Sequence, residues 1–212
     1  MRVFLASNAP AIFALAGVIF GTLATGFINY MSATKEMKLR LTEKLLDKKL
    51  EAHESLLNIV VLIRTMILAG GEDRTGELKR HPLIMDSTKN MNDFLDQFNA
   101  VHNTAERWLS SPIKREVSFF LDYFVNLNEI SRAANDEALQ EAGSVIRNDF
   151  IEIALRLENC AHDFFNKDML KLNYKTDREW HKFPVEETLR KLDKTEFYKN
   201  KKLIVNILRG HV

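Results

Sequence analysis

Arg156 and His162 are the residues whose types and spacing best fit a chemical reaction, and they lie six positions apart in the segment RLENCAH. An arginine guanidinium binds a negatively charged phosphate through charge-assisted hydrogen bonds. A histidine exchanges protons near neutral pH. Arg156 and His162 are therefore the pair to consider for chemistry in this chain.

The spacing of this pair restricts how it could work. Apolar residues recur at intervals of three and four around it, which predicts a helix. Six positions on an unbroken helix correspond to about 120°, so the two side chains would not converge within one chain. A joint site would need a second copy or a distorted helix. The alternative is that both are ordinary surface residues.

The sequence offers no other recognisable chemistry. Helical bundles that bind dinuclear iron use Glu-x-x-His pairs, and this chain has none. It also lacks a phosphate-binding glycine loop, a nucleophile elbow and a zinc cluster. The lone Cys160 cannot form an intramolecular disulfide, which fits a reducing compartment. We expect no metal and no cofactor, and we expect no enzyme activity unless Arg156 and His162 are active.

The composition predicts an all-α protein. Only 8 glycines and 4 prolines occur among 212 residues, and no Asn-Gly or Asp-Gly turn is present, so we exclude a substantial sheet. The hydrophobic fraction of 46% suffices for a packed core. Thirty basic and 29 acidic residues give a net charge of +1, so bulk charge does not support RNA binding. An RNA partner would need a local site.

An uncharged run near the N-terminus predicts a transmembrane helix at residues 9–30. Its first twenty residues, APAIFALAGVIFGTLATGFI, would span about 30 Å as a helix, which matches the hydrocarbon core of a bilayer. A cleaved signal peptide is the alternative. We favour the span, because the run exceeds the usual signal-peptide core and no good Ala-x-Ala site follows.

The faces of this helix differ in character. At about 100° per residue, Thr22, Thr25 and Asn29 share one polar arc, which suggests pore-lining residues. Gly17 and Gly21 form a GxxxG pair on the flank, where helices pack closely. The opposite side is apolar and is expected to face lipid: Phe13, Phe20, Leu23 and Phe27. The alternative is that the threonines bond to their own helix and Asn29 reaches the interface.

Charge asymmetry predicts the orientation. Only Arg2 precedes the span, whereas Lys35, Lys38 and Arg40 follow it at once, with more lysines beyond. The positive-inside rule places the N-terminus outside and the following domain in the cytoplasm. Lys35, Lys38 and Arg40 are the expected contacts with lipid headgroups at the membrane surface.

We divide the chain into four segments. Residues 1–32 form the N-terminal segment and transmembrane helix, and residues 33–69 continue it as a stalk that becomes the first bundle helix, with an apolar stripe reaching Met66. Residues 70–174 form the helical bundle. Residues 175–212 form basic amphipathic C-terminal helices, which are expected to dock on the bundle rather than on lipid or a neighbouring subunit.

Capping residues predict the helix boundaries after a loop at residues 69–82, which contains three glycines. A second helix starts near Asp86 or Ser87 and ends at Ser110-Ser111, where Pro112 opens a third. Further starts are expected at three places: Asn135 or Asp136 for the fourth helix, Pro184 for a short helix through Leu192, and Thr195 for a last one through Leu208.

The segment from Arg156 to His162 resembles the Arg-x4–6-His motif of HEPN domains, which are helical bundles that often act as ribonucleases. The resemblance implies a HEPN-like bundle with a dimeric site, in which Arg156 steadies a phosphate and His162 transfers a proton. HEPN motifs often place a polar residue directly after the arginine, whereas this chain has Leu157. The motif is therefore expected to be degenerate.

The whole layout is similar to the membrane-anchored accessory proteins of type VI-B CRISPR systems, which accompany an RNA-guided, RNA-targeting nuclease. The resemblance implies an oligomeric pore in a bacterial inner membrane that strengthens antiphage defence. We thus expect copies of the chain to assemble in lipid, with that nuclease as a partner and Thr22, Thr25 and Asn29 lining a conduit. The alternatives are a membrane-tethered ribonuclease and a noncatalytic scaffold for a cytoplasmic partner.

Overall fold

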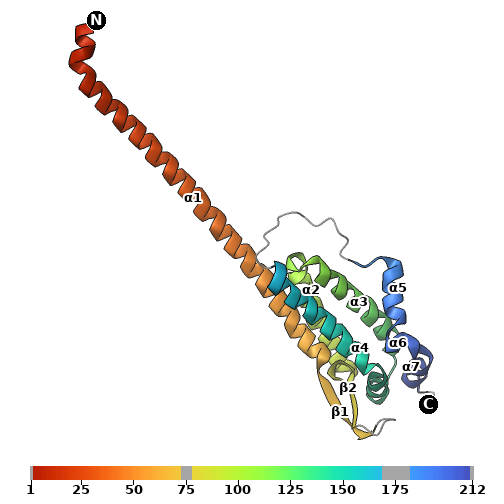
Figure 1. The fold of residues 1–212 in the computed structure, drawn as a ribbon. Coiled ribbons are helices and arrows are strands. Elements are labelled where there is room, and N and C mark those ends of the chain that lie inside the picture. Colours follow the sequence, from red (N-terminus) through yellow and green to blue (C-terminus); the bar gives the residue numbers. More distant parts are fainter. Residues whose placement is uncertain (1, 73–77, 169–181, 211–212) are drawn as a thin grey trace. The chain divides into compact units, whose positions relative to one another are not determined.

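The computed structural model describes residues 2–72, 78–168 and 182–210 (Figure 1). Helices account for 84% and strands for 6%, which confirms a mostly helical fold. The chain divides into two compact units, Met1–Asp47 and Lys48–Val212. Helix α1 (Arg2–Arg64) contributes residues to both.

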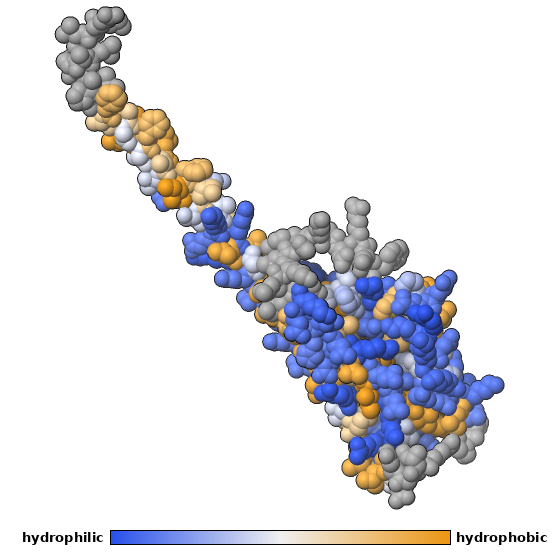
Figure 2. Space-filling model, in the orientation of Figure 1, coloured by the Kyte–Doolittle hydropathy of each residue, from blue (hydrophilic) through white to orange (hydrophobic). Residues whose placement is uncertain are grey.

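The first unit is helical and apolar along much of its length. Ten large apolar side chains between Phe13 and Met31 are exposed, and Phe13 and Phe20 reach 76% and 73%. This part of α1 is long and apolar enough to cross a membrane. Figure 2 shows it as an orange stretch that gives way to blue, hydrophilic residues farther along the helix. The predicted apolar N-terminal helix is confirmed.

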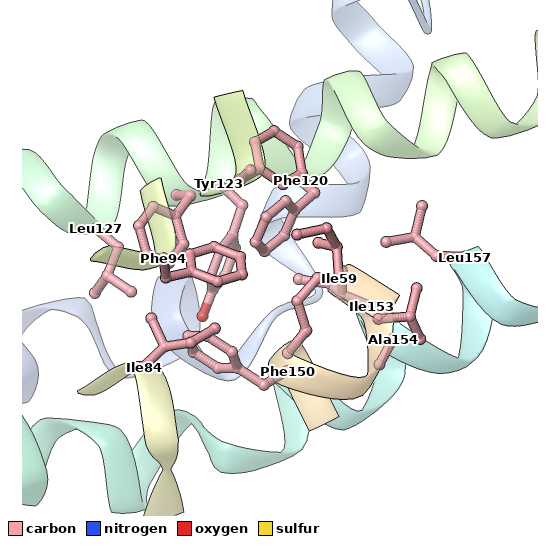
Figure 3. Packing of buried hydrophobic residues seen from close by; sticks show 14 of the residues in the cluster. Ile59, Ile84, Phe94, Phe120, Tyr123, Leu127, Phe150, Ile153, Ala154 and Leu157 are labelled. Carbon is pink, nitrogen blue, oxygen red and sulfur yellow. The ribbon is translucent and has the colours of Figure 1, made fainter. Parts of the chain in front are cut away.

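The second unit is built on residues 48–64 of α1 and three further helices: α2 (Thr88–Ala105), α3 (Ser111–Ser131) and α4 (Asp136–Asp163). Their apolar faces form one buried cluster that is rich in aromatic rings. Phe94 of α2 and Phe120 of α3 lie 5.9 Å apart between ring centroids, and Tyr123 of α3 lies 6.1 Å from Phe150 of α4 (Figure 3). The helices therefore share one core.

Capping groups fix the starts of these helices as predicted. The Ser87 side chain accepts a hydrogen bond from the backbone N–H of Asn90, and the Asn135 side chain accepts one from Ala138. Pro112 lies in the first turn of α3. The predicted end of α2 is wrong: the α-helix stops at Ala105, and a 3-10 turn, η2 (Glu106–Trp108), follows.

The segment expected to be the end of the stalk and a loop contains a β-hairpin instead. α1 ends at Arg64, and β1 (Met66–Glu72) pairs antiparallel with β2 (Leu78–Pro82), with Met66 opposite Pro82. Gly70 and Gly71 lie at a β-bulge, where Gly71 has a φ of 102°. Gly70 and Gly71 thus belong to a strand and not to a loop, and Gly76 of the predicted loop lies outside the described residues. A 3-10 turn, η1 (Leu83–Met85), leads on to α2.

Gly143 of α4 lies where β2 and η1 pack against this helix. A Cβ atom at this position would lie only 3.1 Å from Cβ of Met85 and 3.2 Å from Cβ of His81. The missing side chain lets β2 and η1 approach α4 closely. The strands are therefore stabilised by a contact between residues about 60 positions apart. A local sequence pattern cannot predict such a contact.

After α4, a short π-helix, η3 (Phe164–Asp168), ends the second described range. Three short helices complete the unit: α5 (Val185–Asp193), α6 (Glu196–Lys199) and α7 (Lys201–Leu208). The predicted starts at Pro184 and Thr195 are confirmed, but a break at Asn200 divides the predicted last helix in two. Phe197 and Ile204 are fully buried, which confirms docking on the bundle. The boundary expected at residues 174–175 lies outside the described residues.

Candidate functional site

Arg156 lies on α4 and faces α3. Its Nε is 3.6 Å from Oε2 of Glu116, and its guanidinium carbon lies 4.8 Å from the centre of the Phe119 ring. Nε is buried and makes no hydrogen bond in the described part of the chain. Arg156 is therefore held by a weak ion pair and a cation–π contact, which are structural contacts within the bundle.

Lys191 of α5 competes for the same carboxylate. Its Nζ lies 2.6 Å from Oε1 of Glu116. The same atom lies over the face of the Phe183 ring, 3.6 Å from its centre, in a cation–π contact. Both partners of this pair are largely buried, with 13% of the Glu116 side chain and 16% of the Lys191 side chain exposed. We call Glu116, Phe119, Arg156, Phe183 and Lys191 the Glu116 cluster. It ties α3, α4 and α5 together.

A cavity of about 230 Å³ lies beside the Glu116 cluster. The described residues that line the cavity include three cations and two carboxylates, so the charge of the lining is nearly balanced. No histidine lines it, and it therefore lacks a group that exchanges protons near neutral pH. The lining residues are Asp149, Glu152, Ile153, Arg156, Lys191, Lys194 and Thr195.

His162 occupies the last turn of α4 and is exposed. Because α4 is an unbroken helix from Asp136 to Asp163, His162 and Arg156 point about 120° apart. The structure does not bring the two together within one chain. No family model, curated protein or solved structure matches the chain. The site is therefore judged on its own geometry.

Metal chemistry finds no support in the described residues, where no group of three or more His, Cys, Asp or Glu side chains could hold an ion. Cys160 is half-buried, and burial raises the pKa of its thiol, with the nearby Glu116 and Asp163 adding to the effect. A raised pKa keeps the thiol protonated and unreactive. Cys160 is thus a packing residue.

Asp149 is a buried carboxylate whose residue type and spacing did not predict a functional role. Its Oδ2 accepts hydrogen bonds from the Tyr123 hydroxyl at 3.0 Å and from the backbone N–H of Phe197 at 2.8 Å, and its Oδ1 accepts one from Glu196 N–H at 2.7 Å. Burial raises the pKa of Asp149. Both oxygens are engaged, so Asp149 caps the start of α6. Its burial could have been inferred from the sequence, because Asp149 falls on the inward face of the predicted fourth helix.

His53 is a second buried polar residue. Its ring lies 3.6 Å from the Phe164 ring in a stacked arrangement, and Nδ1 lies 2.6 Å from the carbonyl oxygen of Lys49. A carbonyl only accepts, so Nδ1 carries the proton and Nε2 does not. Nε2 is buried without a partner among the described residues, and burial lowers the pKa of this histidine.

Thr22 and Thr25 of the first unit make their side-chain hydrogen bonds within their own helix. Thr22 Oγ1 donates to the carbonyl oxygens of Val18 and Ile19, at 3.0 and 2.9 Å, and Thr25 Oγ1 donates to that of Gly21 at 2.8 Å. This is the back-bonded arrangement considered as the alternative to a polar interior. Asn29 is exposed.

The expected packing and surface residues of the first unit are all accessible. A Cβ atom built on Gly17 or Gly21 would meet no atom within 4 Å among the described residues, apart from the neighbouring backbone of its own helix. Lys35 and Lys38 are exposed, and Arg40 forms an exposed ion pair with Glu36 at 2.6 Å. These residues can meet lipid or another molecule, because the first unit does not bury them itself.

Proposed function

We propose that this chain is a membrane-anchored protein that works as an assembly of copies, with residues 9–30 crossing the membrane and the unit of residues 48–212 on the cytoplasmic side. One observation carries the proposal: the uncharged helix leaves ten large apolar side chains exposed, while the second unit fills a core of its own. Full burial of such a side chain is worth about 1.5–3 kcal/mol. Lipid and neighbouring spans would supply that burial.

The orientation rests on the basic residues that follow the span, beginning with Lys35, Lys38 and Arg40. It is tested with membrane vesicles that contain the full chain with a C-terminal epitope. Protease should remove the epitope from inverted vesicles and leave it intact in right-side-out spheroplasts. The opposite pattern would place the second unit outside the cytoplasm.

A noncatalytic role for the second unit is supported by the geometry of its candidate residues. Arg156 is engaged by Glu116 and Phe119, and His162 points to a different side of α4. The resemblance to HEPN domains is retained as a proposal about the fold, in which the motif has become structural. In this proposal the second unit binds a cytoplasmic partner. The similarity of the layout to type VI-B CRISPR accessory proteins suggests an RNA-guided nuclease as that partner.

Assembly is tested on the full chain in lipid nanodiscs or mild detergent. We expect a single oligomer whose mass is several times 24.5 kDa after correction for bound lipid. Chemical crosslinking in native membranes should give the same ladder, which guards against detergent artefacts. A monomer in both preparations, or recovery of the chain without membranes, would overturn the proposal.

Ion conduction in antiphage defence is a second candidate function, and the polar arc of Thr22, Thr25 and Asn29 favours it. Proteoliposomes should then release ions, and bulky apolar replacements of all three residues should reduce the release at least tenfold. Ile28→Leu is the matched control, because Ile28 is an exposed apolar residue of the same helix, at 62%. Release that is equal in the wild type and in the triple variant would reject a conduit along the arc.

A further inference from the structure

We propose that a second copy of the chain packs along one row of α1, which we call the aromatic seam: Phe13, Ala16, Phe20, Leu23, Phe27, Tyr30, Thr34, Met37 and Leu41. The inference rests on the proposed function and deepens it, because it names the face through which the copies meet. All nine residues belong to the first unit.

The spacing of the row is the first argument. Its members follow one another at alternating intervals of three and four residues, an average of 3.5. This repeat makes two helices wind round each other with a left-handed twist, and it places each residue of the row against the partner helix. All three phenylalanines between residues 13 and 30 fall on the row. Contact with lipid alone requires no such repeat.

The second argument is that the row continues beyond the part that lipid can cover. Met37 and Leu41 lie seven and eleven residues after Tyr30, which is about 10 and 16 Å farther along the helix. They are 73% and 52% exposed and lie among charged residues such as Lys38. Another helix with the same repeat would cover both parts of the row.

A second copy is the partner that fits without further adjustment. Copies anchored in one membrane with the same orientation lie parallel, with each residue level with its counterpart. At the positions that flank the row, Ala33 of one copy then lies opposite Lys38 of the other, and Arg40 lies opposite Leu45. No like charges therefore oppose each other. Arg40 is already paired with Glu36 of its own helix.

Two lysines mark the end of the seam. Lys44 and Lys48 continue the spacing of three and four after Leu41, and each would face its own counterpart in a parallel pair. Two ammonium groups opposed at such positions repel each other. The contact therefore extends from Phe13 to Leu41 and stops there.

A main contact along the seam excludes the glycine flank and the polar arc as the main contact, and it turns the polar arc outward, so it is an alternative to the conduit lined by Thr22, Thr25 and Asn29. The glycine flank at Gly17 and Gly21 lies about 110° from the middle of the seam, and the polar arc around Thr22 and Thr25 lies about 160° from it. An assembly through either of those faces would leave Met37 and Leu41 uncovered. The three faces make different predictions for crosslinking.

Disulfide crosslinking of the full chain in its membrane tests the inference. Single cysteines are introduced at Phe20, Phe27, Met37 and Leu41 in a Cys160→Ser background, and copper phenanthroline is added as the oxidant. Ile28 and Leu39 are matched controls off the seam, because they are exposed apolar residues of the same helix, at 62% and 63%. We expect at least a fivefold higher dimer yield at the seam positions than at the controls.

A charge introduced into the seam gives an independent readout that does not depend on disulfide geometry. Met37→Glu and Leu41→Glu should each reduce the assembled fraction in nanodiscs at least fivefold, whereas Leu39→Glu should leave it unchanged. All three substitutions lie in the part of α1 that is exposed in the single chain. Equal loss for Leu39→Glu, or no loss for the other two, would contradict the seam.

The outcomes separate this inference from the proposed function. If assembly persists but the strongest crosslinks appear at cysteines placed at Gly17, Gly21, Thr22 or Thr25, the seam is wrong and the assembly stands. If no position crosslinks and the chain is a monomer in nanodiscs, the proposed function fails together with the seam.

Discussion

The Tyr123 hydroxyl donates a hydrogen bond to the carboxylate of Asp149 across 3.0 Å in the core of the second unit. The same carboxylate accepts two backbone N–H groups at the start of α6, so one side chain of α4 holds both α3 and the C-terminal helices. Burial raises the pKa of both Tyr123 and Asp149. The hydrogen bonds from the Glu196 and Phe197 N–H groups, at 2.7 and 2.8 Å, make Asp149 a polar tie between the bundle and its C-terminal helices.

Asp149→Ala should destabilise the second unit by about 3 kcal/mol, because it leaves the Tyr123 hydroxyl and the Phe197 N–H buried without an acceptor. The melting temperature of the full chain in detergent should fall by roughly 6–12 °C, at about 2–4 °C per kcal/mol for a domain of this size. Glu152→Ala, an exposed acidic residue of the same helix, is the control. Equal melting temperatures for the two variants would contradict the tie.

Gly143→Ala should destabilise the protein by about 1 kcal/mol even though alanine favours helices. The new methyl group would lie 3.1 Å from Cβ of Met85 and 3.3 Å from Cδ of Pro82, atoms that cannot rotate away. Overpacking costs about 1–3 kcal/mol, which exceeds the gain of about 1 kcal/mol in helix propensity. Chemical denaturation measures the difference, with Ser144→Ala as the control. A Gly143→Ala variant more stable than the wild type would show that the hairpin can shift.

Lowering the pH from 7 to 5 should weaken the second unit through His53. Burial lowers the pKa of His53 from 6.5, so the unfolded chain binds a proton at a higher pH than the folded chain does. Stability is therefore complete above about pH 6.5 and is lost as the pH falls toward the folded pKa.

The variant His53→Phe isolates this effect. It keeps a ring against Phe164 and removes the titrating group. Unfolding free energies measured at several pH values should show a smaller slope between pH 5 and 6.5 for the variant than for the wild type. Parallel slopes would assign the pH dependence to other groups.

Arg156→Ala and His162→Ala should differ in their effect. Arg156→Ala removes the contact with Phe119 and one of the two cations beside Glu116, so we expect a loss of about 1 kcal/mol. His162→Ala, at an exposed position, should stay within about 0.5 kcal/mol of the wild type. Incubation with single-stranded RNA should give no cleavage that depends on either residue. Cleavage abolished by both substitutions in stable variants would revive the ribonuclease alternative.

Local chemistry explains which parts of the fold were predictable. Ser87, Asn135 and Thr195 each cap a helix with their own side chain, and Pro112 and Pro184 stand at helix starts, so these boundaries follow from the residue types alone. The apolar N-terminal helix followed from its uncharged composition in the same way.

The hairpin was missed because its evidence is not local. Met66 and Leu68 extend the apolar pattern of α1, and Gly70 and Gly71 are typical of loops. What makes the segment a strand is its pairing with residues 78–82 and the space that Gly143 leaves on α4. Neither is visible in a short window of sequence.

The candidate site was only partly predictable for the same reason. The six-residue spacing already showed that Arg156 and His162 point apart on one helix. The contacts that occupy Arg156 come from Glu116 and Phe119, about 40 positions away. The capping role of Asp149 depends on residues 196 and 197, which are equally remote.

The docking of α1 in the second unit also sets the order of events during synthesis. Its buried residues Leu56, Ile59 and Ile63 belong to the same cluster as Ile153 of α4 (Figure 3). About 90 residues separate the two groups, which a ribosome takes roughly 5–20 s to produce. For that time the nascent chain carries an uncovered apolar row that begins at Leu56, about 25 residues after the segment proposed to enter the membrane. Chaperones that bind such rows are therefore expected to meet this chain before it folds.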